Sequence, residues 1–390
     1  MSGGVQLRAL ARRVKAGDVS ALRDAALKTR PGPDALRWEF AAADWLVSLP
    51  SQSSPTTAAH ITQRFMYALF LIRQKHREEA LAELDGILRT DPEFVDAWFV
   101  KGELKRLERK FPEALKCFDE ALARNPSFTD ALVARGRALL GMRNPRGAIE
   151  HFDRALAINP KLASAIAFHG LCWSARGRFD EALADVHQAL DLDPALALAY
   201  AVRAQIYRLQ EKLDEALREA NMALQIDPDL AGAYLERAMV YERQDQPDRA
   251  ITDYTNVLSR DPSQVTAWYR RALLYDQQSQ YEKAVRDYTE AISRAPEQAA
   301  AEAYFRRSEA YRKLGQLDKA LADCSKVGLL LFVEATSENA PLKQGPKTVG
   351  TVVQGEELQV LRVNGDWLWV ESISSSGEAV RGWIDQRHLR

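Results

Sequence analysis

Hydrophobic residues recur along residues 58–327 with a period of 34, and each period holds two stretches in which apolar positions follow helical spacing. An alanine column marks the register: Ala80, Ala114, Ala148, Ala182, Ala216, Ala250 and Ala284, with Ala320 following after a two-residue slip. A proline column runs in step with it: Pro92, Pro126, Pro160, Pro194, Pro228, Pro262 and Pro296. Because a fixed period of this length is the signature of stacked structural units, the pattern predicts a mainly α-helical array.

Each period divides into two helices when the units are numbered from 1 to 34, beginning at residues 61, 95, 129, 163, 197, 231, 265 and 301. Position 4 is large in most units, position 11 is often aromatic, and position 8 is always Gly, Ala or Ser. Large residues at positions 4 and 11 share one face of a first helix, and small residues at 8 and 20 allow the second helix to approach closely. The proline at position 32 ends the second helix, and the Asp or Asn before it suits a turn.

This pattern resembles the tetratricopeptide repeat, whose period and signature it shares. The resemblance covers about residues 58–327 and implies a right-handed α-solenoid of about eight helix hairpins. In tetratricopeptide proteins the first helices line a concave face through positions 2, 5, 9 and 12. The resemblance therefore implies a non-enzymatic scaffold that binds protein or peptide segments on that face.

These positions supply the side chains that we expect to contact a partner, on a surface that is apolar in its first half and mixed in charge in its second. They include Phe65, Leu69, Phe99, Glu103, Arg106, Arg137, Leu171, Gln205, Arg208, Met239, Tyr269, Asp276, Phe305 and Arg312. The alternative is that many of them pack against the neighbouring repeat. Some relatives hold a peptide's terminal carboxylate with Lys at position 5 and Asn at position 9, or carry an asparagine ladder at position 6; this chain has neither.

Opposite charges recur at positions 7 and 23. Arginine at position 7 accompanies an acid at position 23 in four units: Arg203 with Glu219, Arg237 with Asp253, Arg271 with Asp287, and Arg307 with Asp323. We expect a partly buried ion pair between the two helices of each of these hairpins. The alternative is that the two groups are solvated separately.

Residues 1–57 do not fit the period and are expected to form a helical cap of two or three helices, at about 4–16, 18–29 and 33–48. The third of these carries Trp38, Phe40 and Trp45, which suit the covering role that the terminal unit of an array needs. The basic residues of the first helix indicate a solvated face, with docking to a membrane or a partner as the alternative.

After residue 327 the hydrophobic period changes to that of short strands, in VGTVV, ELQVLRV, DWLWVESI and AVRGWI. Asn364-Gly365 predicts a two-residue hairpin turn. Residues 328–390 are similar to the bacterial-type SH3-like domain, at Gly350, Gly355, Trp367, Val370, Gly382 and Trp383. The resemblance implies a small all-β barrel. We expect it to dock on the last hairpin as a cap, or to offer a second peptide site around Trp367 and Trp369.

Composition narrows the function. The net charge is −1, with 53 basic and 54 acidic residues, which argues against a nucleic-acid partner. The longest apolar run, FMYALFLI, is too short to insert across a membrane. The first residues lack the apolar core of a secretory signal, and the three cysteines are an odd number, so we expect a reducing, cytoplasmic setting. The partner's identity and the oligomeric state stay open.

Catalytic motifs are missing from the sequence: it contains no phosphate-binding glycine loop, no Gly-x-Ser-x-Gly and no His-Glu-x-x-His. The best metal candidate is His169, Cys172 and His187, for which a packing histidine is the favoured alternative. We therefore expect no enzyme and no cofactor. The rival interpretations are a metal or enzyme site in residues 1–57 or in the fourth repeat, a regulatory subunit of an enzyme, and an envelope protein that binds cell-wall peptides.

Overall fold

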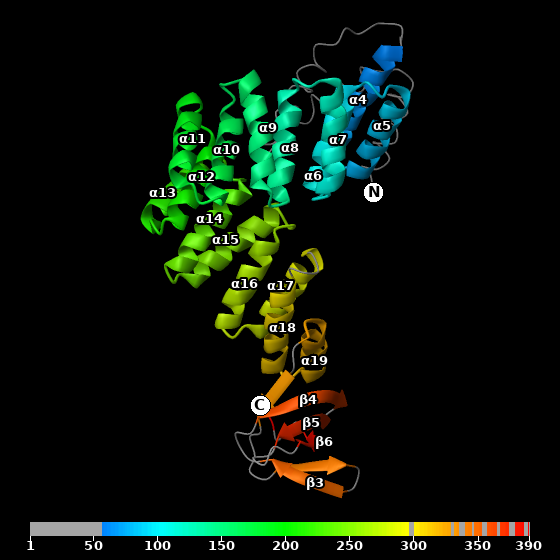
Figure 1. Cartoon of the computed structure of the whole chain (residues 1–390), viewed down its shortest axis with the longest axis vertical. Coiled ribbons are helices and arrows are strands. Elements are labelled where there is room, and N and C mark those ends of the chain that lie inside the picture. Colours follow the sequence, from blue (N-terminus) through cyan, green and yellow to red (C-terminus); the bar gives the residue numbers. More distant parts are fainter. Residues whose placement is uncertain are drawn as a thin grey trace. The chain divides into compact units, whose positions relative to one another are not determined.

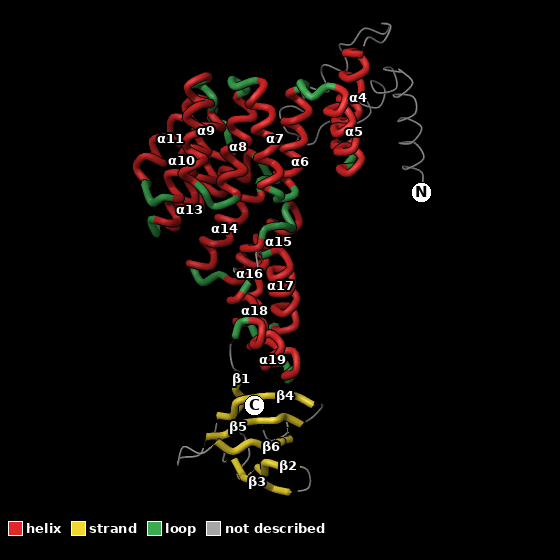
Figure 2. Tube along the Cα trace, turned by 45° about the vertical axis from the view of Figure 1, so that its right-hand side comes forward, coloured by secondary structure: helices red, strands yellow, loops and turns green. Residues whose placement is uncertain are grey.

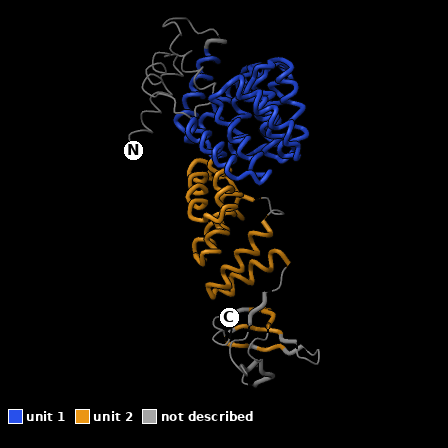
Figure 3. The backbone as a smooth tube through the Cα atoms, turned by 90° about the vertical axis from the view of Figure 1, so that its left-hand side faces the viewer, with its two compact units in different colours: residues 1–233 blue, residues 234–390 orange. Residues whose placement is uncertain are grey.

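The helical repeats and the C-terminal strands are both present in the computed structural model. It describes residues 57–295 and 300–328 and, in the C-terminal region, residues 331–334, 340–344, 347–352, 357–364, 367–373, 379–385 and 389. The cap expected in residues 1–57 lies outside the described residues apart from Thr57, where the first described helix begins. The chain divides into two units, residues 1–233 and 234–390 (Figure 3).

Unit 1 is built of helix hairpins of one kind (Figure 1). Its helices are α4 (Thr57–Arg73), α5 (Arg77–Thr90), α6 (Val95–Leu107), α7 (Phe111–Arg124), α8 (Thr129–Gly141), α9 (Pro145–Ile158), α10 (Ala163–Ala175), α11 (Phe179–Leu192), α12 (Ala197–Leu209) and α13 (Leu213–Ile226). The next helix, α14 (Ala231–Arg243), begins in the last residues of this unit.

Unit 2 continues the same pattern and then changes to strands (Figure 2). Its further helices are α15 (Pro247–Arg260), α16 (Val265–Gln277), α17 (Tyr281–Arg294), α18 (Ala301–Lys313) and α19 (Leu317–Lys326). The described residues thus contain sixteen helices, as eight first helices and eight second helices. The predicted helix hairpins are confirmed.

The hairpins of each unit stack on one another. In unit 1 the second helices α5, α7, α9 and α11 contact the first helix of the next hairpin. First helices also contact each other directly: α6 with α8, α8 with α10, and α10 with α12 in unit 1, and α16 with α18 in unit 2. In each unit one surface is therefore made by first helices, and we call it the first-helix face.

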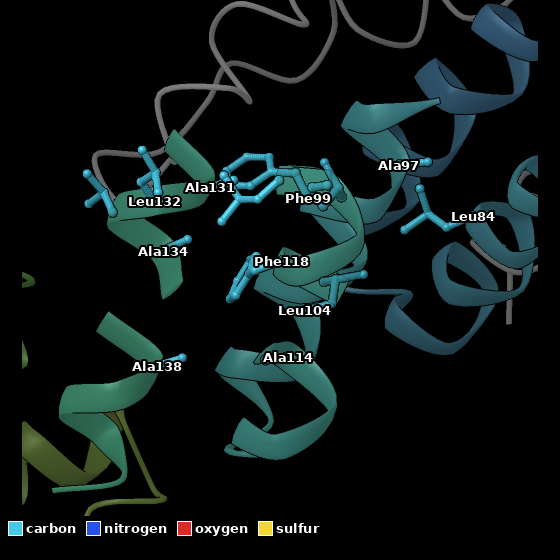
Figure 4. Close-up of a cluster of buried hydrophobic side chains, with 14 of the residues drawn as sticks. Leu84, Ala97, Phe99, Leu104, Ala114, Phe118, Ala131, Leu132, Ala134 and Ala138 are labelled. Atoms are coloured by element: carbon cyan, nitrogen blue, oxygen red, sulfur yellow. The ribbon is translucent and has the colours of Figure 1, made fainter. Parts of the chain in front are cut away.

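Close packing within a hairpin depends on the small residue at position 8. A Cβ atom added to Gly102 would come within 2.5 Å of the Phe118 ring, and one added to Gly136 within 2.6 Å of the Phe152 ring. Both rings are fully buried, so neither can move aside. Phe118 belongs to the hydrophobic cluster of α4–α10 that Figure 4 shows in part.

The turn inside each hairpin contains a residue in the left-handed backbone conformation, which the residue types at this position do not predict. Position 15 has a positive φ in all eight hairpins, and only Gly177 and Gly315 of these residues are glycines; the others are Lys75, Arg109, Arg143, Glu211, Asp245 and Ser279. The next residue donates its N–H five residues back, as Lys110 does to the carbonyl of Lys105. This is the Schellman pattern, which satisfies carbonyls at the end of the first helix.

The turn between hairpins follows the predicted Asp/Asn–Pro signal. The side-chain oxygen at position 31 accepts a hydrogen bond from the N–H two residues later, as Asn125 does from Ser127 at 3.1 Å and Asp261 from Ser263 at 3.0 Å. Each bond closes an Asx turn around the proline. Second helices therefore end at the same place in successive units.

The C-terminal region forms an antiparallel sheet. Its strands are β1 (Leu331–Glu334), β2 (Ala340–Gln344), β3 (Lys347–Val352), β4 (Glu357–Asn364), β5 (Trp367–Ile373) and β6 (Ala379–Asp385), in the order β1-β4-β5-β6-β2-β3. Asn364 pairs with Trp367, so β4 and β5 form the predicted hairpin, with residues 365–366 joining them. About five strands were expected and six are described.

The sheet packs on the last helix. Leu317, Ala320 and Cys324 of α19 share one buried cluster with strand residues. The strand members are Leu358, Val360, Leu368, Val370 and Ile384. Strands β1 and β4 contact α19. The sheet therefore packs on the apolar side of this last helix.

The four predicted ion pairs are confirmed. Nitrogen–oxygen distances are 2.7 Å for Arg203–Glu219, 2.7 Å for Arg237–Asp253, 2.6 Å for Arg271–Asp287 and 2.7 Å for Arg307–Asp323. The last three are two-point pairs, with both carboxylate oxygens bonded. Asp253, Asp287 and Asp323 are buried, so each pair joins the two helices of its hairpin in a low-dielectric place.

Position 7 also connects neighbouring hairpins, through position 25 of the preceding second helix. Arg271 donates to Thr255 and Arg307 to Thr289, both at 2.8 Å. In unit 1 Lys101 pairs with Asp85 at 2.6 Å and Arg135 with Asp119 at 2.7 Å. We call this series of contacts the position-7 ladder.

A histidine takes the place of the arginine in the fourth hairpin. His169 lies 2.7 Å from Asp185 in its own hairpin and 3.3 Å from Asp153 in the preceding one. Burial opposes the charged imidazole, but the hydrogen bond to Asp185 and the charges of both carboxylates raise the pKa of His169 above its usual value. His169 is therefore the titratable member of the position-7 ladder in the fourth hairpin.

We predict that Asp287→Ala destabilises the protein by about 3–5 kcal/mol, because it leaves the Arg271 guanidinium buried without its counter-ion. The double change Arg271→Met, Asp287→Leu should cost much less. Thermal unfolding followed by circular dichroism compares them, with Glu215→Ala as the control at an exposed pair, expected within about 1 kcal/mol of wild type. A double variant less stable than Asp287→Ala would contradict the role of the buried pair.

We predict that wild-type stability falls relative to a His169→Arg variant as the pH is raised. A raised folded-state pKa means that the stabilisation is fully present below the unfolded pKa, about 6.5, and is lost as pH rises through the folded value. Melting temperatures of both proteins between about pH 5.5 and 9 test this. Parallel curves would show that His169 does not carry its charge in the ladder.

Candidate functional site

The side chains expected to contact a partner divide by burial on the first-helix face. Leu69, Phe99 and Glu103 are 7%, 7% and 2% exposed. The half-buried members are Phe65, Arg106, Arg137, Leu171, Gln205 and Arg208 in unit 1 and Met239, Tyr269, Asp276, Phe305 and Arg312 in unit 2. In the sheet Trp369 is half-buried, while the side chain of Trp367 lies outside what the structure describes.

Phe99 contributes to the core of unit 1. Its ring centroid is 5.1 Å from that of Phe128 and 6.3 Å from that of Phe118 (Figure 4). The alternative of packing against the neighbouring repeat therefore describes this residue, and a charge placed there would disturb the fold.

Three predicted residues come together in unit 1. Glu103 and Arg106 lie one turn apart on α6 and form two parallel hydrogen bonds, Nε–Oε1 at 2.8 Å and Nη2–Oε2 at 2.9 Å. Arg137 approaches the same carboxylate from α8, with Nη1 3.9 Å from Oε2. One buried carboxylate thus faces two guanidinium groups, which leaves an excess of one positive charge.

Burial and charge act in opposite directions on Glu103. Burial alone would raise the pKa of Glu103, but the hydrogen bond from Arg106 and the charges of Arg106 and Arg137 hold it below its ordinary value. Burial and the neighbouring Arg106 lower the pKa of Arg137 to about 10. Glu103 and Arg137 are therefore both charged at neutral pH.

The Arg137 guanidinium lies over the Phe168 ring of α10, 5.1 Å from its centroid. Phe168 is at position 6 and was not among the expected contact residues. Its side chain also packs against Phe152, with centroids 5.9 Å apart and the rings nearly parallel. Position 6 is small or branched in the preceding two units, so the repeat pattern does not predict that an aromatic there meets an arginine of α8.

The first-helix face of unit 2 carries acids, arginines and tyrosines. Arg306 donates to Glu302 at 3.0 Å, and the Tyr269 hydroxyl is 3.4 Å from the same carboxylate. Arg312 pairs with Glu309 at 2.9 Å. These arginines therefore already form ion pairs with acids of the same helix.

The three residues of the metal candidate in the fourth repeat do not form a common site. His169 is engaged by two aspartates, Cys172 is fully buried, and His187 is exposed on α11. Burial, with Asp185 and Asp153, raises the pKa of the Cys172 thiol to about 12. Within the described residues no three histidine, cysteine or acidic side chains come close enough to hold a metal ion.

None of the described helices is both long enough and apolar enough to cross a bilayer.

Comparison with known proteins places the repeats in one family. The family described as tetratricopeptide repeat matches residues 105–163, 174–231, 235–299 and 271–327, together more than half of the chain. No significant match was found among curated proteins.

Several solved structures are similar to this chain at low sequence identity, and two of them have TM-scores above 0.5. A monomeric mutant of IFIT1 with Gppp-AAAA is 15% identical, with a TM-score of 0.53, over 71% of this chain and 69% of that chain. The APC/C hetero-tetramer Cut9–Hcn1 is 14% identical, with a TM-score of 0.51, over 68% of this chain and 55% of that chain. A tetratricopeptide repeat protein from Parabacteroides merdae is 19% identical, with a TM-score of 0.48, over 62% of this chain and 96% of that chain.

The 34-residue period, the helix hairpins with a small residue beneath an aromatic ring, and the family match lead to one conclusion. The chain belongs to the tetratricopeptide repeat family.

Proposed function

We propose that this protein is a non-enzymatic scaffold whose first-helix face binds a segment of a partner protein. The tetratricopeptide fold indicates a protein–protein interaction scaffold, and the peptide-binding step is our own inference. The observation that carries it is the state of Arg137, a half-buried guanidinium with spare hydrogen-bond donors beside an aromatic ring.

A guanidinium has five N–H donors in a fixed fork. Among the described residues Arg137 has one ion-pair contact, at 3.9 Å to Glu103, and no closer hydrogen bond. The Arg137 side chain is 29% exposed, so it is partly removed from water, and this burial lowers its pKa. Such a group favours a ligand that accepts two hydrogen bonds, above all a carboxylate.

Apolar side chains flank the charged group. Phe168 lies against Arg137, and Leu171 is half-buried on the same helix, α10. A bound segment could therefore place an acidic residue on Arg137 and an apolar residue beside it, as helices and extended peptides do on such surfaces. The arrangement differs from a Lys and Asn pair at positions 5 and 9, which this chain lacks.

The partner that we favour is a protein. The IFIT1 structure contains Gppp-AAAA, but the present chain has balanced charge and an unpaired donor suited to one carboxylate. A nucleic-acid surface needs a basic excess along its length. The three buried, free cysteines support the reducing, cytoplasmic setting that we propose.

The sheet is proposed to be an SH3-like barrel that caps the right-handed solenoid. Support comes from the cluster in which Leu317, Ala320 and Cys324 are covered by strand residues. Without the strands, α19 would present these apolar side chains to water. The terminal unit of a repeat array needs a polar outer face to stay soluble. The half-buried Trp369, with Trp367, remains our candidate for a second peptide site.

We predict that Arg137→Gln reduces partner binding about tenfold or more while the array keeps its fold, because it removes the charge-assisted bonds. Crosslinking of the full chain in a cell extract, with quantitative mass spectrometry, measures recovery of each bound protein. Arg154→Gln on α9 is the matched control, since Arg154 is exposed on a second helix. Proteins recovered equally with both variants would contradict a role of Arg137 in binding.

We predict that a chain ending at Val327 melts at a lower temperature than the full chain or aggregates. Each large apolar side chain that loses its cover costs about 1.5–3 kcal/mol if it was fully buried, and Leu317 is 7% exposed in the full chain. Differential scanning calorimetry and light scattering compare the two proteins. An equally stable, monodisperse truncated chain would rule out the capping role.

A further inference from the structure

Two successive hairpins of unit 2 have a tyrosine at position 24 and an acid at position 12. Position 24 is Tyr254 in the hairpin of α14 and α15 and Tyr288 in that of α16 and α17. Position 12, at the end of the first helix, is Glu242 in the former and Asp276 in the latter. The two sites can therefore be compared residue by residue.

The earlier site is complete. The hydroxyl of Tyr254 donates a hydrogen bond to Glu242 Oε2. Arg270, at position 6 of the following first helix, reaches the same carboxylate, with Nη1 3.3 Å from Oε2 and 3.5 Å from Oε1. In this hairpin a phenol and a guanidinium from the next hairpin satisfy the acid.

The later site lacks both contacts. Tyr288 is fully buried, and its hydroxyl is among the buried polar atoms that have no hydrogen-bond partner in the described part of the chain. Asp276 is half-buried, and its carboxylate forms neither a hydrogen bond nor an ion pair with any described residue. Aspartate is one methylene shorter than glutamate, which accounts for the missing contact with the phenol.

The guanidinium is also diverted. Arg306 is the position-6 equivalent of Arg270, and it donates to Glu302 on its own helix at 3.0 Å. Two extra residues precede α18 compared with the other units, so the spacing from the position-12 acid is 30 residues here and 28 in the earlier hairpin. Arg306 therefore forms no hydrogen bond or ion pair with Asp276, although its charge acts on that carboxylate through space.

The Asp276 carboxylate is partly removed from water, and none of the described charged side chains near it forms an ion pair with it. Burial raises the pKa of Asp276, Arg306 and Lys313 oppose this effect through space, and Glu309 adds to it. Arg312 is already paired with Glu309. Burial and the charge of Asp276 also raise the pKa of Tyr288. The Asp276 carboxylate can accept N–H groups from a ligand, whereas the Tyr288 hydroxyl is buried beneath the surface.

The ring of Tyr269 completes the site. The rings of Tyr269 and Tyr288 have centroids 5.9 Å apart. Guanidinium groups lie over tyrosine rings elsewhere in this chain, as Arg260 does over Tyr234 at 4.7 Å and Arg203 over Tyr200 at 5.3 Å. Tyr269 is half-buried, so part of its ring is open to a ligand.

We propose that Asp276 and Tyr269 form a subsite for an arginine side chain of a protein segment bound on the first-helix face of unit 2. The inference rests on the proposed function and adds the residue type that unit 2 selects. The incoming guanidinium makes the contact that Arg270 makes with Glu242 in the preceding hairpin: it donates to Asp276 and stacks on Tyr269.

The probes are N-acetyl-argininamide and N-acetyl-citrullinamide, which have nearly the same shape and differ in charge. Their binding to the full chain is measured by saturation-transfer NMR titration. We expect saturable binding of the arginine derivative and binding about tenfold weaker or less for the citrulline derivative, because a charge-assisted bond is lost. Equal affinities for the two probes overturn the proposal, as does binding of N-acetyl-lysinamide as tight as that of the arginine derivative.

Asp276→Asn should weaken binding of the arginine derivative about tenfold while the melting temperature stays the same or rises, because an unpaired half-buried charge is removed. Asp318→Asn, at an exposed carboxylate of α19, is the matched control and should bind as wild type does. Unchanged affinity in Asp276→Asn overturns the subsite.

The Arg137→Gln variant distinguishes failure of this subsite from failure of the binding role proposed for Arg137. It should leave binding of the arginine derivative unchanged, because Arg137 belongs to unit 1. Loss of probe binding in Asp276→Asn but not in Arg137→Gln supports the subsite even if no partner depends on Arg137. Equal loss in both variants overturns it.

Discussion

The close contact between the two helices of a hairpin is the constraint on which the other features depend. It requires a position without a large side chain on the first helix and a ring on the second, as in Gly102 with Phe118 and Gly136 with Phe152. At this distance the position-7 cation and the position-23 acid come within hydrogen-bond reach, which a wider hairpin would not permit. Packing thus comes first, and the buried charges are placed by it.

Stacking of hairpins then follows from contacts that each unit offers to the next. The position-7 side chain bonds within its hairpin and reaches position 25 of the preceding one, so one residue stabilises both the unit and its junction. Such coupling between neighbours is what makes a repeat array cooperative. Replacement of the arginine by His169 in the fourth hairpin keeps the geometry but makes that junction depend on protonation.

Candidate binding features arise where a unit departs from this pattern. Arg137 stands at a position where it shares Glu103 with Arg106 and keeps donors to spare. Asp276 is too short for a contact that Glu242 makes one hairpin earlier. A repeated architecture supplies many equivalent positions, and small departures at a few of them create groups whose hydrogen bonds a ligand can complete.

The sequence by itself determined the family, the helix hairpins, the turns at Asp/Asn–Pro and the four ion pairs. These all lie within one 34-residue period, where fixed helical spacing brings positions 7 and 23 to facing surfaces. The strands and the hairpin at residues 364–367 were also predicted from local alternation. Only the tertiary structure decided which of the expected contact residues are buried and that Phe168 lies against Arg137. It also decided that the Tyr288 hydroxyl has no hydrogen-bond partner among the described residues. Those features depend on how far a side chain of one helix reaches toward its neighbour, and a difference of one methylene changes the outcome while leaving the periodic pattern the same.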